Sequence, residues 1–196
     1  MQKSFSLRSV VWAGGVSLAA LAMVGCSSTG TTQGKASAPS TRAELESQAT
    51  ATLNRLYSAM PGTREQIARA KGVLICPAVI GGSFVVGAEH GKCVLRSNGT
   101  SRGYYSTTAA SIGWQAGGQS KAVIYVFSTN DAYNKFVNSD GWSVGADATV
   151  AVGKAGANGS VDTDTINAPI SSYVLTNAGL EAGVSVQGSK ITKIQM

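Results

Sequence analysis

The sequence predicts an α+β protein that is mainly an antiparallel β-sheet, curved or partly closed into a barrel, with N-terminal helices packed against it. Composition is the first indication, because 24 glycines and 13% charged residues suit a sheet with many tight turns better than a helical bundle. The second is the pattern of apolar residues. The longest segment in which they recur at helical spacing ends before residue 61, and the segments after it are short apolar runs separated by turn signals. The third is size, since 196 residues with 43% apolar content allow one domain with a full core.

Residues 1–25 are expected to be a lipoprotein signal peptide. Two basic residues precede an apolar run over residues 10–24 that is too short and too weakly apolar for a stable membrane span. The run leads into Cys26 through small residues and resembles a bacterial lipobox, so we expect Cys26 to be diacylated and to become the new N-terminus. Ser27, instead of aspartate, then implies sorting to the outer membrane of a Gram-negative bacterium. The alternative is ordinary signal cleavage beside an incidental cysteine.

Residues 26–40 form a polar, low-complexity segment that we expect to be a disordered tether. A helix is predicted from Thr41, which can cap it, with Glu44 at the capping-box spacing. Pro61 and Gly62 should end this helix, and a second one is predicted over residues 63–70. The apolar residues of the first helix recur every three or four positions, at Leu45, Ala49, Leu53, Leu56, Tyr57 and Met60.

Three strands are predicted next, over residues 73–76, 84–87 and 92–95. Pro77 should end the first strand, because proline has no amide hydrogen to give to a sheet ladder. Residues 88–91 should form the loop between the other two strands.

Turn signals and alternation place the remaining elements. Asn98 and Gly99 predict a type I′ hairpin turn. Every second residue from Trp142 to Val152 is apolar, which predicts the clearest strand in the chain. The other predicted elements are strands over residues 111–122 and 123–127, a short helix capped within 128–131, a turn at 158–159 and strands over 170–175, 180–186 and 191–194.

Catalytic and metal-binding chemistry finds little support in the sequence. His90 is the only histidine, which excludes a site with several histidines within one chain. No phosphate loop, calcium loop or Gly-x-Ser-x-Gly elbow is complete. We therefore expect a protein that is not an enzyme and that holds no cofactor or metal ion.

Cys76 and Cys93 remain as a pair once Cys26 is acylated. In an oxidising compartment this even remainder favours a disulfide between neighbouring strands, with two free buried thiols as the alternative. A catalytic pair of either cysteine with His90 is not favoured, because both cysteines lie in predicted strands and away from any basic helix terminus.

The charge of the chain points away from nucleic acid. The formal net charge is +6, or +4 once Lys3 and Arg8 leave with the signal peptide. The remaining basic residues are spread singly along the chain, whereas a nucleic-acid binder concentrates them in one patch. Solvated surface charge is the simplest reading, and attraction to an anionic membrane is the alternative.

Several motifs occur in an order that resembles the SYLF domain family. They are Ala70-Lys71-Gly72, the residues 87–91 (GAEHG), Tyr104-Tyr105-Ser106, the residues 113–117 (GWQAG) and the residues 141–148 (GWSVGADA). The resemblance extends from about Glu44 to the C-terminus, so we expect a SYLF-like domain over residues 41–196. This family comprises lipid-binding and actin-binding domains of yeast and animal adaptor proteins, together with bacterial lipoproteins. The resemblance implies that the domain binds lipid.

The sequence therefore favours a membrane-anchored lipoprotein that binds anionic phospholipid. The candidate lipid-binding residues, chosen from charge and position, are Arg55, Arg64, Arg69 and Lys71. In the family an amphipathic N-terminal helix is implicated in membrane contact; the alternative here is that the apolar stripe of this helix packs on the sheet. The alternative function is a structural lipoprotein that binds another protein of the cell envelope. Actin binding is not expected, because an exported protein would meet no actin in its own cell.

Overall fold

The computed structural model describes six parts of the chain, which are residues 38–82, 86–112, 119–154, 160–177, 179–181 and 186–196. The chain divides into two compact units, Met1–Gln33 and Gly34–Met196. All described elements lie in the second unit. The predicted signal peptide, Cys26 and most of the tether fall outside the described residues, and so does the turn predicted at 158–159.

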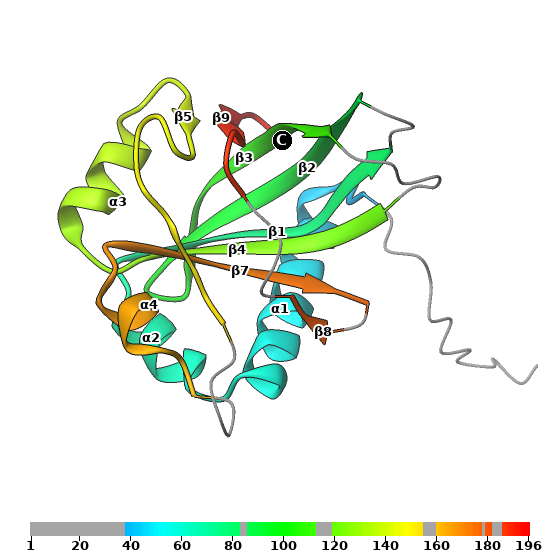
Figure 1. Ribbon diagram of the computed structural model, residues 1–196. Coiled ribbons are helices and arrows are strands. Elements are labelled where there is room, and N and C mark those ends of the chain that lie inside the picture. The colour runs from blue at the N-terminus through cyan, green and yellow to red at the C-terminus, as the bar shows by residue number, and fades with distance from the viewer. Residues whose placement is uncertain (1–37, 83–85, 113–118, 155–159, 178, 182–185) are drawn as a thin grey trace, which may run out of the picture. The chain divides into compact units, whose positions relative to one another are not determined.

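The second unit is an α+β domain with a strongly curled, mostly antiparallel sheet (Figure 1). Nine strands are found in the described residues, in the order β5-β9-β3-β2-β1-β4-β7-β6, with β8 beside β7. Only β6 and β7 run parallel among these pairs. The predicted fold class is therefore confirmed. The elements are α1 (Arg42–Ala59), α2 (Thr63–Arg69), β1 (Gly72–Gly82), β2 (Val86–Ser97), β3 (Thr100–Ile112), β4 (Gln119–Phe127), α3 (Asn130–Val137), β5 (Trp142–Ser143), β6 (Ala151–Val152), α4 (Thr163–Asn167), β7 (Ile170–Thr176), β8 (Gly179–Leu180) and β9 (Lys190–Ile194).

Helix α1 begins at the predicted cap. The Thr41 side chain accepts a hydrogen bond from the Glu44 backbone N–H at 3.2 Å. The Glu44 carboxylate accepts a bond from the Ser40 backbone N–H at 2.8 Å, one residue earlier than a capping box requires. The helix ends at Ala59, and its C-cap residue, Met60, lies directly before Pro61.

The prediction that Pro77 ends the first strand is wrong. Strand β1 runs on to Gly82 and pairs with β2 on one side and β4 on the other. Both ladders shift register around Pro77, between Ile75 and Ala78 toward β2 and between Cys76 and Val79 toward β4. Such an irregularity leaves one residue out of the ladder, so a residue without an amide hydrogen fits there.

The loop predicted over residues 88–91 is also a strand. These residues belong to β2, where His90 is paired with Ile80 of β1 and with Thr108 of β3. In contrast, the hairpin at Asn98 and Gly99 is confirmed, because both residues have positive φ, 51° and 73°, as a type I′ turn requires.

The long strand predicted from Trp142 to Val152 is wrong as well. Only its two ends are strands, β5 and β6, and the chain turns between them at residues 145–147. Gly145 has a φ of 92°, a conformation that side chains rarely adopt. Trp142, Val144 and Val150 are still buried. Ala146, which lies in the turn, is exposed, so the alternation of apolar residues predicts burial at only part of these positions.

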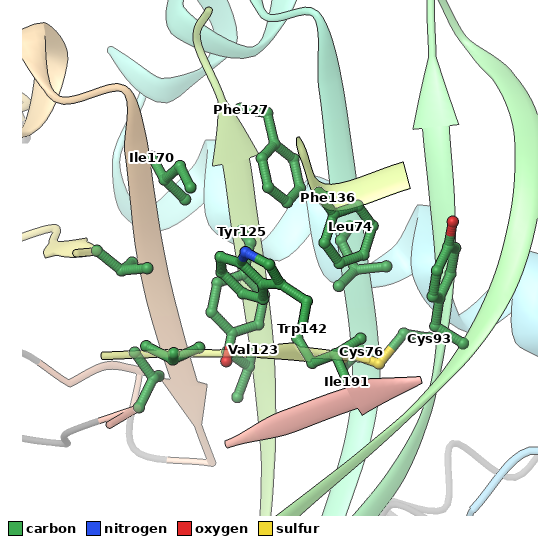
Figure 2. Close-up of a cluster of buried hydrophobic side chains, with 14 of the residues drawn as sticks. Leu74, Cys76, Cys93, Val123, Tyr125, Phe127, Phe136, Trp142, Ile170 and Ile191 are labelled. Carbon is green, nitrogen blue, oxygen red and sulfur yellow. A yellow bond between two sulfur atoms is a disulfide. The ribbon is translucent and has the colours of Figure 1, made fainter. Parts of the chain in front are cut away.

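The sheet carries a hydrophobic core on each face. Helix α1 covers one face with the buried residues Leu45, Ala49 and Leu56. On the other face, Figure 2 shows the aromatic rings of Tyr125, Phe127, Phe136 and Trp142 gathered together. The Trp142 ring meets the Tyr125, Phe127 and Phe136 rings edge-on, with centroids 6.0, 6.0 and 5.4 Å apart, an arrangement that aromatic pairs prefer.

The predicted disulfide is confirmed. Cys76 on β1 and Cys93 on β2 are joined within the second core, as Figure 2 shows, and both are fully buried. The bond links two consecutive strands across the position where their ladder shifts register. Because both sulfur atoms are in the disulfide, neither cysteine is a free thiol in this structure.

Candidate functional site

The four predicted lipid-binding residues are all exposed, but they do not form one cluster. The Arg55 guanidinium donates to the Thr176 carbonyl at the end of β7, at 2.8 Å. Arg64 lies over the Tyr57 ring, with its guanidinium carbon 4.4 Å from the ring centroid. Arg69 is paired with Glu65 one helical turn away, and Lys71 follows α2 directly. Arg64, Arg69 and Lys71 thus belong to α2 and its exit, whereas Arg55 is held by β7.

The apolar stripe of α1 packs on the sheet and does not face solvent. Leu45, Ala49, Thr52 and Leu56 are the buried residues of this helix. The docked position is secured by the carboxylate of Glu46. Arg96 of β2 donates to that carboxylate at 2.6 Å and forms a partly buried ion pair with it.

Further donors surround Glu46, so both oxygens of its carboxylate accept hydrogen bonds. Ser101 and Tyr104 of β3 both donate to its second oxygen. Burial alone would raise the pKa of Glu46, but the hydrogen bonds from Ser101 and Arg96 outweigh it and hold the pKa below its ordinary value. A charged Glu46 therefore joins α1 to β2 and β3.

A second helix, α4, lies beside α2. The side-chain amide of Gln66 donates to the Thr165 carbonyl at 3.4 Å and to the Ser171 hydroxyl at 3.0 Å. The amide oxygen of Gln66 accepts from the Tyr173 hydroxyl, and burial raises the pKa of that hydroxyl to about 12. Gln66 thus connects α2 with α4 and β7.

Helix α4 also carries an exposed apolar residue, Ile166, which directly follows Thr165 in sequence. Ile166 is 48% exposed, which is unusual for a large hydrophobic residue among those described. We define the α2–α4 surface by Arg64, Arg69, Lys71 and Ile166. Glu65 and Asp164 lie on the same two helices and Asp162 caps α4, so three cations stand beside three carboxylates.

A separate hollow of about 390 Å³ lies between α3, the residues 142–151 and the start of β7. We call it the Trp142 hollow. Its apolar lining consists of Ala132, Trp142, Ala148, Ala151, Ala168, Pro169 and Ile170. Its polar lining consists of Asp131, Lys135, Asp147 and Thr149.

The turn that sequence analysis missed builds one wall of this hollow. Asp147 closes the turn, because its carboxylate accepts from the Ser143 backbone N–H at 2.6 Å and its own N–H donates to the Ser143 carbonyl at 2.9 Å. Ala148 and Thr149 follow directly and line the hollow. Gly145 followed by Asp147 within the residues 141–148 was the available sign of a turn, since glycine and aspartate are both common in turns.

Two charged residues of the hollow, Lys135 and Asp131, are held only by an exposed ion pair in the described contacts. Lys135 pairs with Asp131 at 3.0 Å along α3, and both side chains are mostly exposed. An exposed pair of this kind contributes about 0.2–0.5 kcal/mol, because water screens it. Lys135 can therefore exchange this partner for another anion at little cost.

The described residues also bear on a metal site and on a membrane-spanning helix. His90 is an exposed residue of β2, and no group of three or more His, Cys, Asp or Glu is placed to hold a metal ion in the part of the chain that the structure describes. No helix within the described ranges is both long and apolar enough to cross a membrane.

The fold and these surfaces define an α+β domain whose curled sheet is covered on both faces by helices. The family model described as Ysc84, Las17-binding protein actin regulator, matches residues 108–195. This model represents the SYLF domain, so the match confirms the resemblance to the SYLF domain family. It covers every residue that lines the Trp142 hollow, and of the α2–α4 surface it covers Ile166. No curated protein matches the chain.

Proposed function

We propose that the protein is a non-enzymatic lipoprotein, anchored to the bacterial outer membrane through acylated Cys26, whose SYLF-like domain binds anionic lipid at the α2–α4 surface. The observation that carries the proposal is the exposed Ile166 on α4, a helix that is joined by the Gln66–Thr165 hydrogen bond to α2, which carries Arg64 and Arg69. Peripheral proteins bind membranes by combining apolar burial with attraction to anionic lipids. Each lysine or arginine near such a surface contributes about 1 kcal/mol.

The apolar stripe of α1 is not assigned to membrane contact. Its residues are buried against the sheet, so exposing them to a membrane would lose the free energy of their burial in this core. Arg55 is also left out of the proposed surface, because its guanidinium is held by the Thr176 carbonyl.

Because of the tether, a weakly charged surface is sufficient for the domain to bind the membrane. The segment from Cys26 to Ser40 would span at most about 50 Å when fully extended. As a flexible coil it would span about 20 Å. A domain held this close to the membrane meets lipid at a high effective concentration, so a modest intrinsic affinity is enough.

Vesicle flotation tests the proposal. A shortened chain beginning at Gly34 keeps the whole second compact unit and removes Cys26. We expect it to float with anionic phosphatidylglycerol vesicles at low salt, to float less at moderate salt, and to remain in solution with neutral phosphatidylcholine vesicles.

Two variants and a matched control locate the surface. Replacing Arg64, Arg69 and Lys71 by glutamine should abolish flotation, and Ile166→Ser should weaken it at every salt concentration. The control replaces three exposed basic residues elsewhere, Arg102, Lys190 and Lys193, by glutamine and should float like the parent chain. Equal loss in both triple variants would mean that net charge, and not the α2–α4 surface, drives binding. No flotation of the parent chain would refute lipid binding by the domain.

A protein of the cell envelope is the second candidate partner. The matching family is described by protein binding, as a Las17-binding protein actin regulator, which favours an interaction role. Actin itself is not proposed, because an exported lipoprotein would meet none in its own cell. Crosslinking of the anchored protein in its own membrane, with and without Ile166→Ser, would identify such a partner.

A further inference from the structure

Strand β3 extends beyond the strand that covers its outer edge. Along one side, β3 is paired with β2 from Thr100 to Ile112. Along its other side, β9 pairs only with residues 104–108. In the part of the chain that the structure describes, residues 109–112 therefore have no neighbouring strand on their outer side.

The chain turns away from this edge directly before β9. Gly188 has a φ of 76°, and the Ser189 N–H donates to the Val186 carbonyl at 3.3 Å, which closes a turn. The Ser189 carbonyl accepts from the Val144 N–H at 2.9 Å, so it is directed toward the segment that follows β5. The residues before β9 thus make other contacts and do not continue its ladder along β3.

The open edge belongs to a supported part of the sheet. Residues 86–89 of β2 pair with residues 109–112, and β1 pairs in turn with β2 at Gly81 and Gly82. Strand β4 reaches the same level, because Gln119 pairs with Gly81. The backbone of residues 109–112 is therefore held extended by a sheet of four strands. A held row of unpaired backbone N–H and C=O groups is a template for pairing with another chain.

The other edges of the described sheet carry protection that this one lacks. Strands β5, β6 and β8 have two residues each, and β9 carries Lys190 and Lys193. Short edge strands and lysines are both means by which proteins prevent pairing at a sheet edge. Residues 109–112 have the sequence AASI, without a charge, a proline or a glycine.

The sheet face beside this edge is also accessible. Ala110 and Thr108 of β3 are exposed, and so are their partners on β2, Ala88 and His90. Ile80 of β1, which is paired with His90, is 36% exposed. A strand added beside β3 would therefore find Ala110 and Thr108 open to contact with its own side chains.

We propose that residues 109–112 are a self-association edge, at which two copies of the chain pair their β3 strands antiparallel about a two-fold axis. Such an interface uses the same residues on both copies. In the register that pairs all four residues, Ala109 of one copy lies beside Ile112 of the other, and Ala110 lies beside Ser111. Because the edge is uncharged, this pairing opposes no like charges.

The edge favours a second copy over an extended segment of a different protein. A sheet edge binds a foreign peptide selectively only when side-chain pockets accompany the backbone hydrogen bonds. The exposed neighbours of this edge are small side chains, such as Ala110 and Ala88, which form no such pocket among the described residues. The proposal goes beyond lipid binding, because it concerns another surface and another partner.

Sedimentation equilibrium without vesicles measures the association. The experiment uses the mature chain from residue 26 with Cys26→Ser, which keeps the whole domain and carries no acyl group. Four paired residues make an interface far smaller than that of a stable dimer, so protein concentrations up to about 1 mM are used. We expect a reversible equilibrium between monomer and dimer.

Two lysine variants distinguish the edge from the face beside it. Ala110→Lys should weaken dimerisation at least about tenfold, because the two-fold axis brings the added lysines of the two copies together. The matched control is Ala88→Lys, which adds the same charge on the same exposed face but one strand farther from the edge. It should change the dissociation constant by no more than about twofold.

Cysteine cross-linking tests the geometry of the pair. In the proposed register the two copies of residue 110 are diagonal neighbours, within the Cα separation of about 7 Å that a disulfide requires. The copies of residue 88 are one strand farther away on each side. Ala110→Cys should therefore give a cross-linked dimer under mild oxidation, and Ala88→Cys should not. Circular dichroism verifies that each variant is folded.

Three results would overturn the proposal. One is a parent chain that stays monomeric at every concentration, which would leave the edge to a different partner. Another is equal weakening by Ala110→Lys and Ala88→Lys, which would indicate that the exposed faces stack and the edges do not pair. The third is cross-linking through Ala88→Cys but not through Ala110→Cys. None of these results involves vesicles, so failure of self-association and failure of lipid binding are distinguishable.

Discussion

Breaking the Cys76–Cys93 disulfide should lower the free energy of unfolding by about 3 kcal/mol. The two cysteines are 17 residues apart, and a cross-link that closes a loop of this length removes chain entropy worth about 3 kcal/mol from the unfolded state. For a domain of this size, the melting temperature should fall by about 6–12 °C.

Two measurements separate the cross-link from the packing of the sulfur atoms. Urea unfolding of the parent chain with and without reductant compares the same atoms, bonded or not, and should give the difference of about 3 kcal/mol. The Cys76→Ala, Cys93→Ala double variant also removes two fully buried sulfur atoms and should lose about 1–2 kcal/mol more.

A cross-link that destabilises the unfolded chain must make the oxidised protein more stable than the reduced one. If reduced and oxidised chains unfold within about 0.5 kcal/mol of each other, the cross-link does not act on the unfolded state as supposed. If only the alanine variant is destabilised, packing of the sulfur atoms accounts for the whole effect.

Three further predictions follow from the packing of α1, β6 and β7. Leu56→Ala, in the buried stripe of α1, should cost about 2–5 kcal/mol in urea unfolding, and the exposed Asn54→Ala should cost far less. Gly153→Ala should cost about 1–3 kcal/mol, because the added methyl group overlaps the ring of the buried Tyr173; an unchanged melting temperature would contradict that overlap. Glu46→Gln should flatten the loss of stability in acid: the pKa of Glu46 is held low in the fold, so its stabilising charge is fully present above about pH 4.5 and is lost as the pH falls through the lower, folded value. If the variant and the parent chain have the same pH dependence between pH 3 and 5, Glu46 does not secure α1 in this way.

Local chemistry explains why the fold class could be predicted from sequence. The turn at Asn98 and Gly99 needs two adjacent residues with positive φ, and these two residue types adopt them readily. The stripe of α1 follows from helical spacing alone. Both features depend on neighbours in the chain.

The wrong strand predictions concern places where contacts between distant segments decide the conformation of the chain. Pro77 is accommodated in β1 because both neighbouring ladders shift register there, and neither shift can be inferred from the residues around the proline. Between Trp142 and Val152, apolar residues alternate as in a strand, yet the chain turns back at Gly145 and leaves Ala146 exposed. The periodicity identified Trp142, Val144 and Val150 as buried, but it did not show that the chain turns between them.

The candidate sites were predictable only in part. Charge and position identified Arg64, Arg69 and Lys71, but not that Ile166, almost a hundred residues later, lies on the helix beside α2. The Trp142 hollow is assembled from α3, the turn after β5 and the start of β7. No local spacing links these three segments, so only the tertiary structure reveals the hollow.

The pairing of β9 with β3 has a consequence for how the chain must fold. Strands β1, β2 and β3 are consecutive antiparallel neighbours and can pair as soon as they emerge. The outer edge of β3 over residues 104–108 is covered only when Lys190–Ile194 arrives, close to the end of the chain. Until then β3 presents unpaired backbone groups, the kind of edge on which chains aggregate. Loss of the last seven residues would make that exposure permanent, so a C-terminal truncation should be more harmful to solubility than its size suggests.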